Sequence, residues 1–256
     1  TTVADLRAVV QAGHAPGRSH QPPTKQPAWS GTWAGGMLRR LTQPTLIGLW
    51  MALSGARPIG KTLVATDQQP PFIIAAAPHR HWLDAFLIYA ALPRRWRGKL
   101  VIVANQHFAE FFSPTRRGSL GGRLLKHLAY QALLPLVFPF VIVPDYGSTR
   151  EGLFELGQLI DRGHSPITFP KGFYFQPEDA SQHAPGMALL AIQTERPILP
   201  IWLDKNDALR PFPPRRNPAV AVHIGRPIPV HGAMSPADVI ARVEAAFDEL
   251  AGREPA

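Results

Sequence analysis

The stretch FIIAAAPHRHWLDAFLIYAAL, residues 72–92, joins a strand pattern to a helix pattern through a short polar turn. The continuous apolar run 72–77 is typical of a strand that is buried on both faces. Apolar residues at helical spacing follow from Phe86 onward. The turn between them carries His79 and Asp84, five positions apart. A strand that passes into a helix through such a turn is typical of α/β proteins.

The rest of the chain repeats this alternation of strand and helix patterns. Apolar runs predict five further strands, at 99–104, 138–143, 165–169, 198–203 and 219–224. Helical patterns fall near 37–54, 83–92, 119–134, 149–163, 186–194 and 236–251. The last helix has the clearest start, because Ser235 is an N-cap residue, Pro236 suits the first helical position and Asp238 completes a capping-box-like pair. The alternation predicts an α/β fold with a mixed, largely parallel sheet flanked by helices.

The first part of the chain has a different composition. A short helix is expected over residues 2–10, and residues 13–30 are rich in Pro, Gly, His and Gln, with almost no apolar residues. We therefore expect a flexible linker or leader over residues 1–32 and one folded domain over residues 33–256, which is long enough to bury a full core.

Composition narrows the range of functions. The chain of 256 residues has no cysteine, which excludes a disulfide framework, cysteine-ligated zinc and a thiol nucleophile. Its 27 Lys and Arg exceed its 18 Asp and Glu and give a net charge of +9, so acidic partners are expected. No nucleic-acid-binding motif occurs. The arginines stand in small groups beside apolar segments, which favours a lipid surface, with a solvated basic face as the alternative.

Two uncharged stretches bear on a membrane role. The stretch 41–56 is 16 residues long and is flanked by Arg39, Arg40 and Arg57, whereas the stretch 128–144 is 17 residues long and is interrupted by Pro135 and Pro139. Both are shorter than the ~20 residues that a spanning helix needs. The first stretch predicts an interfacial helix whose arginines lie at the level of the lipid headgroups. The second is interpreted as a helix end that runs into a buried strand.

The pair His79 and Asp84 suits base catalysis. A carboxylate that holds one imidazole nitrogen orients the ring and stabilises the imidazolium that forms when the other nitrogen takes a proton. The contact requires His79 to lie just before the helix and Asp84 to reach back across the first turn. His81 is an alternative partner for Asp84, because residues at i and i+3 also meet. The histidines lack the spacing of a metal site, and no G-x-S-x-G elbow for a serine nucleophile occurs.

The order of four motifs resembles the glycerolipid acyltransferase family, over roughly residues 40–230. The first block, H-x-x-x-x-D, matches at His79 and Asp84, and the second supplies Arg150 within GSTREG. The third block, F-P-E-G-T-R-S in the family, reads FPKGFYF here, with Lys171 in place of Glu and Gly172 retained. The fourth is the apolar LPI at 199–201. The segments HAPG at 183–186 and HIGRPI at 223–228 also resemble family stretches.

The resemblance implies a division of roles within one site. His79 and Asp84 would be the catalytic pair, with His79 as general base, and Arg150, Lys171 and Gly172 would bind the acceptor's phosphate. His183 is a further histidine that could face the cleft. Aromatic residues 173–175 replace the polar phosphate ligands of the family, so an acceptor with a larger and less charged head, such as a sugar, an amino lipid or a polyketide alcohol, fits better.

The sequence therefore predicts an acyltransferase that moves a fatty acyl group from acyl-CoA or an acyl-carrier protein to a lipid hydroxyl. The acyl donor is a co-substrate, and neither a cofactor nor a metal is expected. The enzyme is expected to bind peripherally at the cytoplasmic face of the inner membrane, and the chain resembles the C-terminal part of a fusion behind an acyl-activating ligase. Two alternatives stay open: a non-catalytic lipid-binding or docking module with a degenerate acceptor site, and a thioesterase-like hydrolase.

Overall fold

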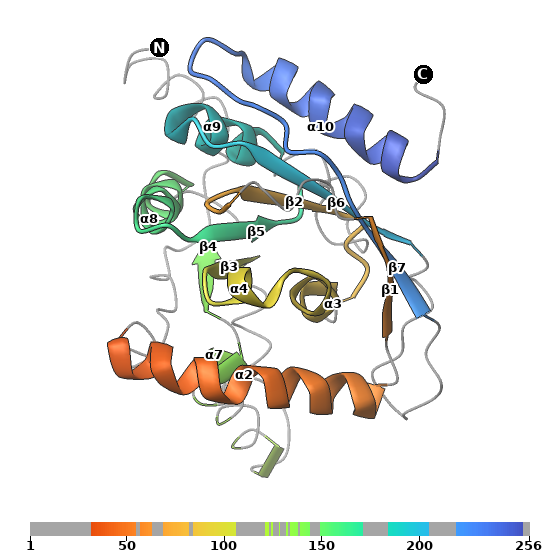
Figure 1. Ribbon diagram of the computed structural model, residues 1–256. Helices are drawn as coiled ribbons and strands as arrows, with labels where there is room; N and C mark the ends of the chain where they lie inside the picture. Colours follow the sequence, from red (N-terminus) through yellow and green to blue (C-terminus); the bar gives the residue numbers. More distant parts are fainter. Residues whose placement is uncertain are drawn as a thin grey trace.

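Strand β2 (Ile73–Ala77) lies in the middle of a seven-stranded sheet (Figure 1). The structure is a computed structural model. It describes residues 32–54, 57–62, 69–81, 84–105, 121, 122, 124, 128, 132, 134–137, 139–143, 149–170, 184–204 and 219–252. All five residues of β2 are buried, as expected for a strand covered on both faces.

The sheet is mixed but largely parallel, which confirms the predicted fold class. Its order is β1-β7-β6-β2-β5-β3-β4, and every pairing is parallel except that of β6 with β7. The other strands are β1 (Arg57–Thr62), β3 (Leu100–Asn105), β4 (Phe140–Val143), β5 (Ser165–Thr168), β6 (Ile198–Asp204) and β7 (Ala219–Ile224). Because β2 to β6 run in the same direction, their carboxyl ends meet at one edge of the sheet.

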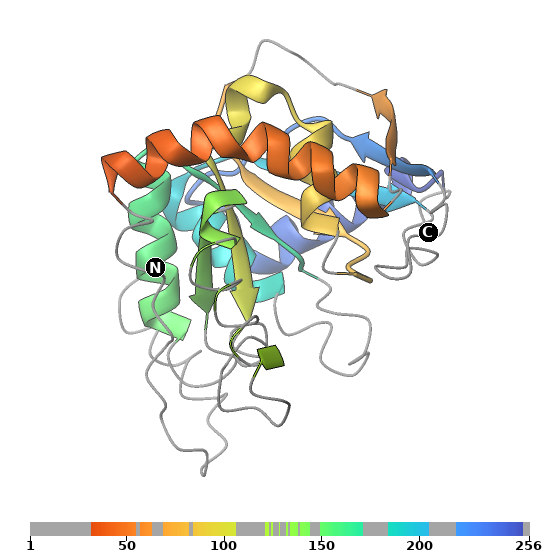
Figure 2. The same ribbon diagram turned by 90° about the horizontal axis from the view of Figure 1, so that it is seen from below.

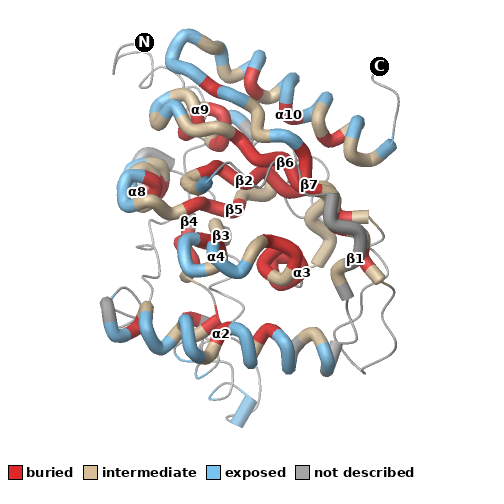
Figure 3. Tube along the Cα trace, in the orientation of Figure 1, coloured by how far each residue is buried: buried red, intermediate tan, exposed pale blue. Residues whose placement is uncertain are grey.

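Helices cover both faces of the sheet (Figures 1 and 2). One face carries α2 (Trp33–Ser54), α3 (Asp84–Ala91), α4 (Arg94–Arg97) and α7 (Leu134–Val137). The other carries α8 (Thr149–Asp161), α9 (Ala184–Thr194) and α10 (Pro236–Leu250). Figure 3 shows the buried residues along the strands and on the inward sides of these helices.

The side chains of β2 divide the interior into two apolar clusters. Ile74 and Ala76 pack in the cluster under α3 and α2, whereas Ile73, Ala75 and Ala77 pack in the cluster under α8, α9 and α10. Alternate residues of a strand point to opposite faces, so one strand contributes to both cores. This double packing keeps the carboxyl end of β2 in a fixed position relative to its neighbours.

The structure confirms the six predicted strands within two residues at each end, and it shows the predicted capping box of α10, with Ser235, Pro236 and Asp238 in their expected places. Strand β1 was not predicted, because its sequence RPIGKT has no apolar run. As an edge strand it tolerates a proline and a lysine. The short helix α4 was also not predicted, whereas α7 followed by β4 matches the helix end that was expected to run into a buried strand within 128–144. The helix expected at 119–134 lies mostly outside the described residues, as do the leader and its short helix.

Helix α2 begins earlier than predicted and is held against the body by its polar side chains. It starts at Trp33 rather than at residue 37, because the Thr32 hydroxyl accepts a hydrogen bond from the Gly35 amide at 3.1 Å. Three of its side chains donate to the last carbonyls of α7: Arg39 to Pro135 (2.9 Å), Thr42 to Leu136 (3.3 Å) and Gln43 to Val137 (2.6 Å). No described helix has the length and apolarity that crossing a membrane needs.

Close packing at Gly225 gives a test of the fold. A Cβ atom at this position would lie 2.8 Å from Cγ of Pro200 in β6 and 3.2 Å from Cδ1 of Leu250 in α10. We expect Gly225→Ala to lower the free energy of unfolding in urea by about 1–3 kcal/mol. The control Gly157→Ala lies within α8, where an added Cβ meets nothing within 4 Å. It should leave stability unchanged or raise it slightly. Equal effects of the two variants would contradict this packing.

Candidate active site

His79 and Asp84 lie at the carboxyl end of β2. The strand ends at Ala77, and α3 begins at Asp84. The turn that joins them therefore lies at the edge of the sheet where β2, β5 and β6 all end. In open α/β sheets, ligands bind at this edge. The side chain of His79 is 17% exposed, whereas that of Asp84 is completely buried. A partly accessible imidazole is thus backed by a carboxylate that has no contact with water.

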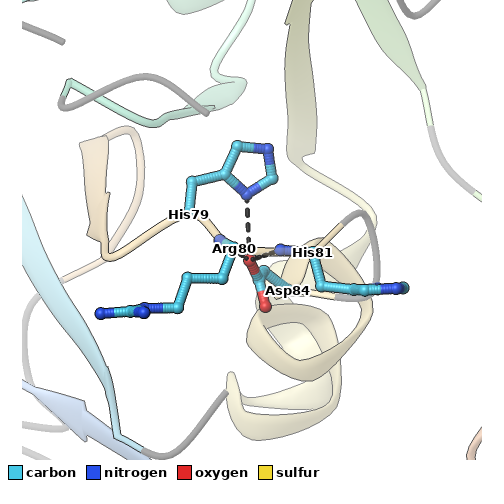
Figure 4. A network of polar contacts seen from close by, with 4 residues as sticks. All are labelled: His79, Arg80, His81 and Asp84. Atoms are coloured by element: carbon cyan, nitrogen blue, oxygen red, sulfur yellow. Dashed lines mark hydrogen bonds and ion pairs between the residues drawn. The ribbon is translucent and has the colours of Figure 1, made fainter. Parts of the chain in front are cut away.

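One oxygen of Asp84 contacts three residues of the turn before α3 (Figure 4). Asp84 Oδ2 lies 3.0 Å from Nδ1 of His79, and it accepts hydrogen bonds of 2.8 Å from the backbone amides of Arg80 and His81. The Asp84 amide in turn donates to the His81 carbonyl at 2.9 Å. A buried carboxylate is costly unless it is well hydrogen-bonded, so these donors hold the turn in one conformation.

This arrangement explains the five-residue spacing of the pair. Residues at i and i+5 do not share a helical face. Here His79 lies in the turn before α3, and the turn folds back over the first residue of the helix, so the two side chains meet. The expected contact is therefore confirmed. The ring of the alternative partner, His81, points away from the carboxylate in Figure 4, and His81 contacts Asp84 through its backbone amide.

The contact with Asp84 selects one tautomer of the His79 ring. An ionised carboxylate only accepts hydrogen bonds, so Nδ1 carries the proton in this contact. The lone pair of the neutral ring then belongs to Nε2, which points away from Asp84 (Figure 4). A histidine held in this way has the tautomer that a general base requires.

Phe169, the first residue of the FPKGFYF motif, is a further residue of the site. It directly follows β5, the strand beside β2. Its ring stacks on the His79 imidazole, with 3.8 Å between ring centroids and 17° between ring planes. A signal was present in the sequence, since an aromatic residue ends one predicted strand and a histidine follows another. Only the order of the strands in the sheet brings them together.

The structure describes less of the predicted acceptor site. Arg150 belongs to the first turn of α8, which follows the carboxyl end of β4 after a short segment, and its backbone therefore lies toward the same edge of the sheet as His79. Lys171, Gly172 and His183 lie outside the described residues. Among the residues that are described, no group of three or more His, Asp and Glu side chains could hold a metal ion.

Comparisons with a family model and with solved structures both gave matches. The sequence model of the acyltransferase family matches residues 62–204, which is more than half of the chain. The crystal structure of the 1-acyl-sn-glycerophosphate acyltransferase PlsC from Thermotoga maritima has a similar fold, with a TM-score of 0.51 and 16% sequence identity. The similarity covers 86% of this chain and 88% of that one. No curated protein matches the sequence significantly.

The burial of Asp84 predicts unequal effects of removing the two members of the pair. Asp84→Ala leaves the amides of Arg80 and His81 without their acceptor, so we expect the free energy of unfolding to fall by about 2–4 kcal/mol. His79→Ala removes only one of the three donors to the carboxylate and should cost less, about 1–2 kcal/mol. Urea denaturation of both variants measures the difference. If Asp84→Ala were as stable as His79→Ala, the carboxylate would not be holding the turn.

Proposed function

The chain belongs to the acyltransferase family, and from that premise we propose that it transfers a fatty acyl group from a thioester to a lipid hydroxyl, with His79 as the general base. The observation that carries the proposal is the buried contact between Asp84 and Nδ1 of His79. It supports a role for Nε2, the ring nitrogen that points away from Asp84, as the proton acceptor at the carboxyl edge of the sheet, where α/β proteins bind ligands.

In the proposed reaction, Nε2 of His79 takes the proton of the acceptor hydroxyl as that oxygen attacks the thioester carbonyl. The tetrahedral intermediate collapses with cleavage of the carbon–sulfur bond, and the imidazolium returns the proton to the departing thiolate. The products are an ester and a free thiol, and the histidine is neutral again. Asp84 stays ionised throughout, where it orients the ring and stabilises the imidazolium. The step needs no cofactor and no covalent intermediate on the protein.

The proposed donor is acyl-CoA or an acyl-carrier protein, and the proposed acceptor is a lipid with one reactive hydroxyl. Arg150, Lys171 and Gly172 are the proposed acceptor-binding residues. Support comes from the place of residue Arg150 in the first turn of α8, because the amino end of a helix favours an anionic group. The aromatic residues 173–175 favour a head larger than that of a simple phosphate ester.

We further propose that the enzyme works at a membrane surface and that α2 provides the contact. The outward side of α2 carries four exposed apolar residues, Met37, Leu38, Leu41 and Leu49, of which Leu41 is 72% exposed. The helix also has two arginines and no carboxylate. An apolar row with one exposed arginine, Arg40, beside it suits the boundary between anionic headgroups and acyl chains. The hydrogen bonds from α2 to α7 would keep that row in a fixed orientation relative to the catalytic edge.

The catalytic proposal predicts the loss of one acylated product. Wild-type protein incubated with an acyl-CoA pool and a total lipid extract should form an acylated lipid that mass spectrometry identifies. His79→Ala should lower the rate of formation by about 10²–10⁴-fold, because that is the usual contribution of a general base. Asp84→Asn, which keeps the shape of the side chain and removes its charge, should give a substantial part of the same loss.

His81→Ala is the matched control for the catalytic test. It removes a neighbouring imidazole whose ring points away from Asp84, and activity should stay within about threefold of wild type. Full activity of His79→Ala would contradict the proposal. Release of free fatty acid without an acylated lipid would indicate a hydrolase instead. An intact donor with every protein, together with unchanged vesicle binding, would indicate a lipid-binding module.

The membrane proposal predicts weaker binding to vesicles when the apolar row of α2 is charged. Leu41→Glu should lower partitioning to vesicles of phosphatidylcholine and phosphatidylglycerol by about tenfold, because it removes an inserted leucine and adds a repelled charge. Phe154→Glu is the control, since Phe154 is similarly exposed, at 69%, but lies on α8 at the other face of the sheet. Sedimentation of both variants with vesicles measures the difference. Equal binding of the two variants would contradict a role for α2.

A further inference from the structure

From the stacked rings of Phe169 and His79 we infer that Phe169 is a positioning residue, which sets the plane of the imidazole and thereby the direction of Nε2. The inference rests on the proposed function, because it concerns the base of that reaction. The two ring centroids are 3.8 Å apart and the ring planes differ by 17°, so the contact extends over the faces of both rings.

One hydrogen bond does not fix an imidazole ring. The contact with Asp84 at 3.0 Å holds the Nδ1 corner of the ring, and by itself this contact would leave the ring able to tilt about that corner. Terminal torsions of histidine are broad, so the side chain's own preferences do not select one plane. A second ring packed in parallel on its face removes this freedom. Asp84 and Phe169 together therefore hold Nε2 in one direction, which a base needs in order to meet the acceptor hydroxyl.

Phe169 is itself held in place by the sheet. The residue before it, Thr168, pairs with Ala75 of β2, and its hydroxyl donates to the Ile74 carbonyl at 3.0 Å. The residue after it, Pro170, is buried. The two rings thus extend from adjacent strands, each just beyond the point where its strand ends. The backbones of both stacked residues are therefore held by the pairing of β2 with β5.

The stack also contributes electrostatically during the reaction. The face of an aromatic ring carries a partial negative charge, and it attracts a cation placed over it within about 6 Å. The His79 ring becomes such a cation when it takes the proton of the acceptor. Phe169 then stabilises the imidazolium on its face while Asp84 stabilises it at Nδ1. A leucine at position 169 would fill a similar volume but would offer neither a flat face nor this attraction.

Steady-state kinetics of Phe169→Leu and Phe169→Tyr test the inference. We expect Phe169→Leu to lower kcat by about tenfold with KM nearly unchanged, because the base is misdirected while substrate binding is intact. Phe169→Tyr keeps the stacked ring and should retain kcat within about twofold to threefold. A loss that appears in KM alone, or an equal loss in both variants, would overturn the inference and would point to a role in binding the substrate.

A double-variant comparison separates this inference from the catalytic proposal. In a His79→Ala background, Phe169→Leu should cause no further loss, because a residue that acts through His79 has nothing left to position. A loss that persisted in this background would contradict the inference. If His79→Ala alone were fully active, the proposed function would fail. If His79→Ala were inactive while Phe169→Leu kept full activity, only the role of Phe169 would fail.

Proton NMR tests the stack without relying on a measurement of activity. A ring stacked on the imidazole should move the carbon-bound protons of His79 upfield of those of His231, which is an exposed histidine. The His79 signals are assigned by their disappearance in His79→Ala. Phe169→Leu should move them back downfield. Signals of His79 at the same position as those of His231 would overturn the inference.

Discussion

The burial of one carboxylate underlies the architecture of the site. Asp84 has no exposed surface, and its Oδ2 atom satisfies two backbone amides and the imidazole of His79. Because an isolated buried charge would be strongly unfavourable, the turn between β2 and α3 must supply these donors. The same contacts that satisfy the buried carboxylate also orient the imidazole of His79, which is the proposed base. Structure and proposed chemistry therefore depend on a single set of hydrogen bonds.

The sheet fixes the position of the turn that carries His79. Strand β2 is paired on both sides and packs into both apolar clusters, so its end cannot shift without disturbing the core. Its neighbour β5 ends beside it and places Phe169 on the face of the imidazole. Helix α2 is hydrogen-bonded to α7, and the apolar residues Met37, Leu38, Leu41 and Leu49 of α2 are exposed. A catalytic edge fixed by the sheet and an outer helix with exposed apolar residues together suit the proposed transfer of an acyl chain from a soluble carrier to a lipid.

The sheet and the contact between His79 and Asp84 were largely predictable from the sequence. Strong apolar runs predicted the six strands, and the local pair His79 and Asp84 predicted the contact, since both features depend on residues that are near in sequence. The stack of Phe169 on His79 was not predicted, because it depends on the pairing of strands whose residues lie more than ninety positions apart. Strand β1 was missed because its few apolar residues pair only at an edge. The roles of Arg150, Lys171 and Gly172 stay predictions.

The central claim is that Asp84 holds His79 in the tautomer of a base, and the ring nitrogens report this directly. Nitrogen-15 NMR at mildly alkaline pH, where histidine side chains are ordinarily neutral, distinguishes a protonated from an unprotonated ring nitrogen. The account predicts that His79 carries its proton on Nδ1, with Nε2 unprotonated, and that Asp84→Asn weakens this preference. A proton found on Nε2 of His79 in the wild-type protein would contradict it.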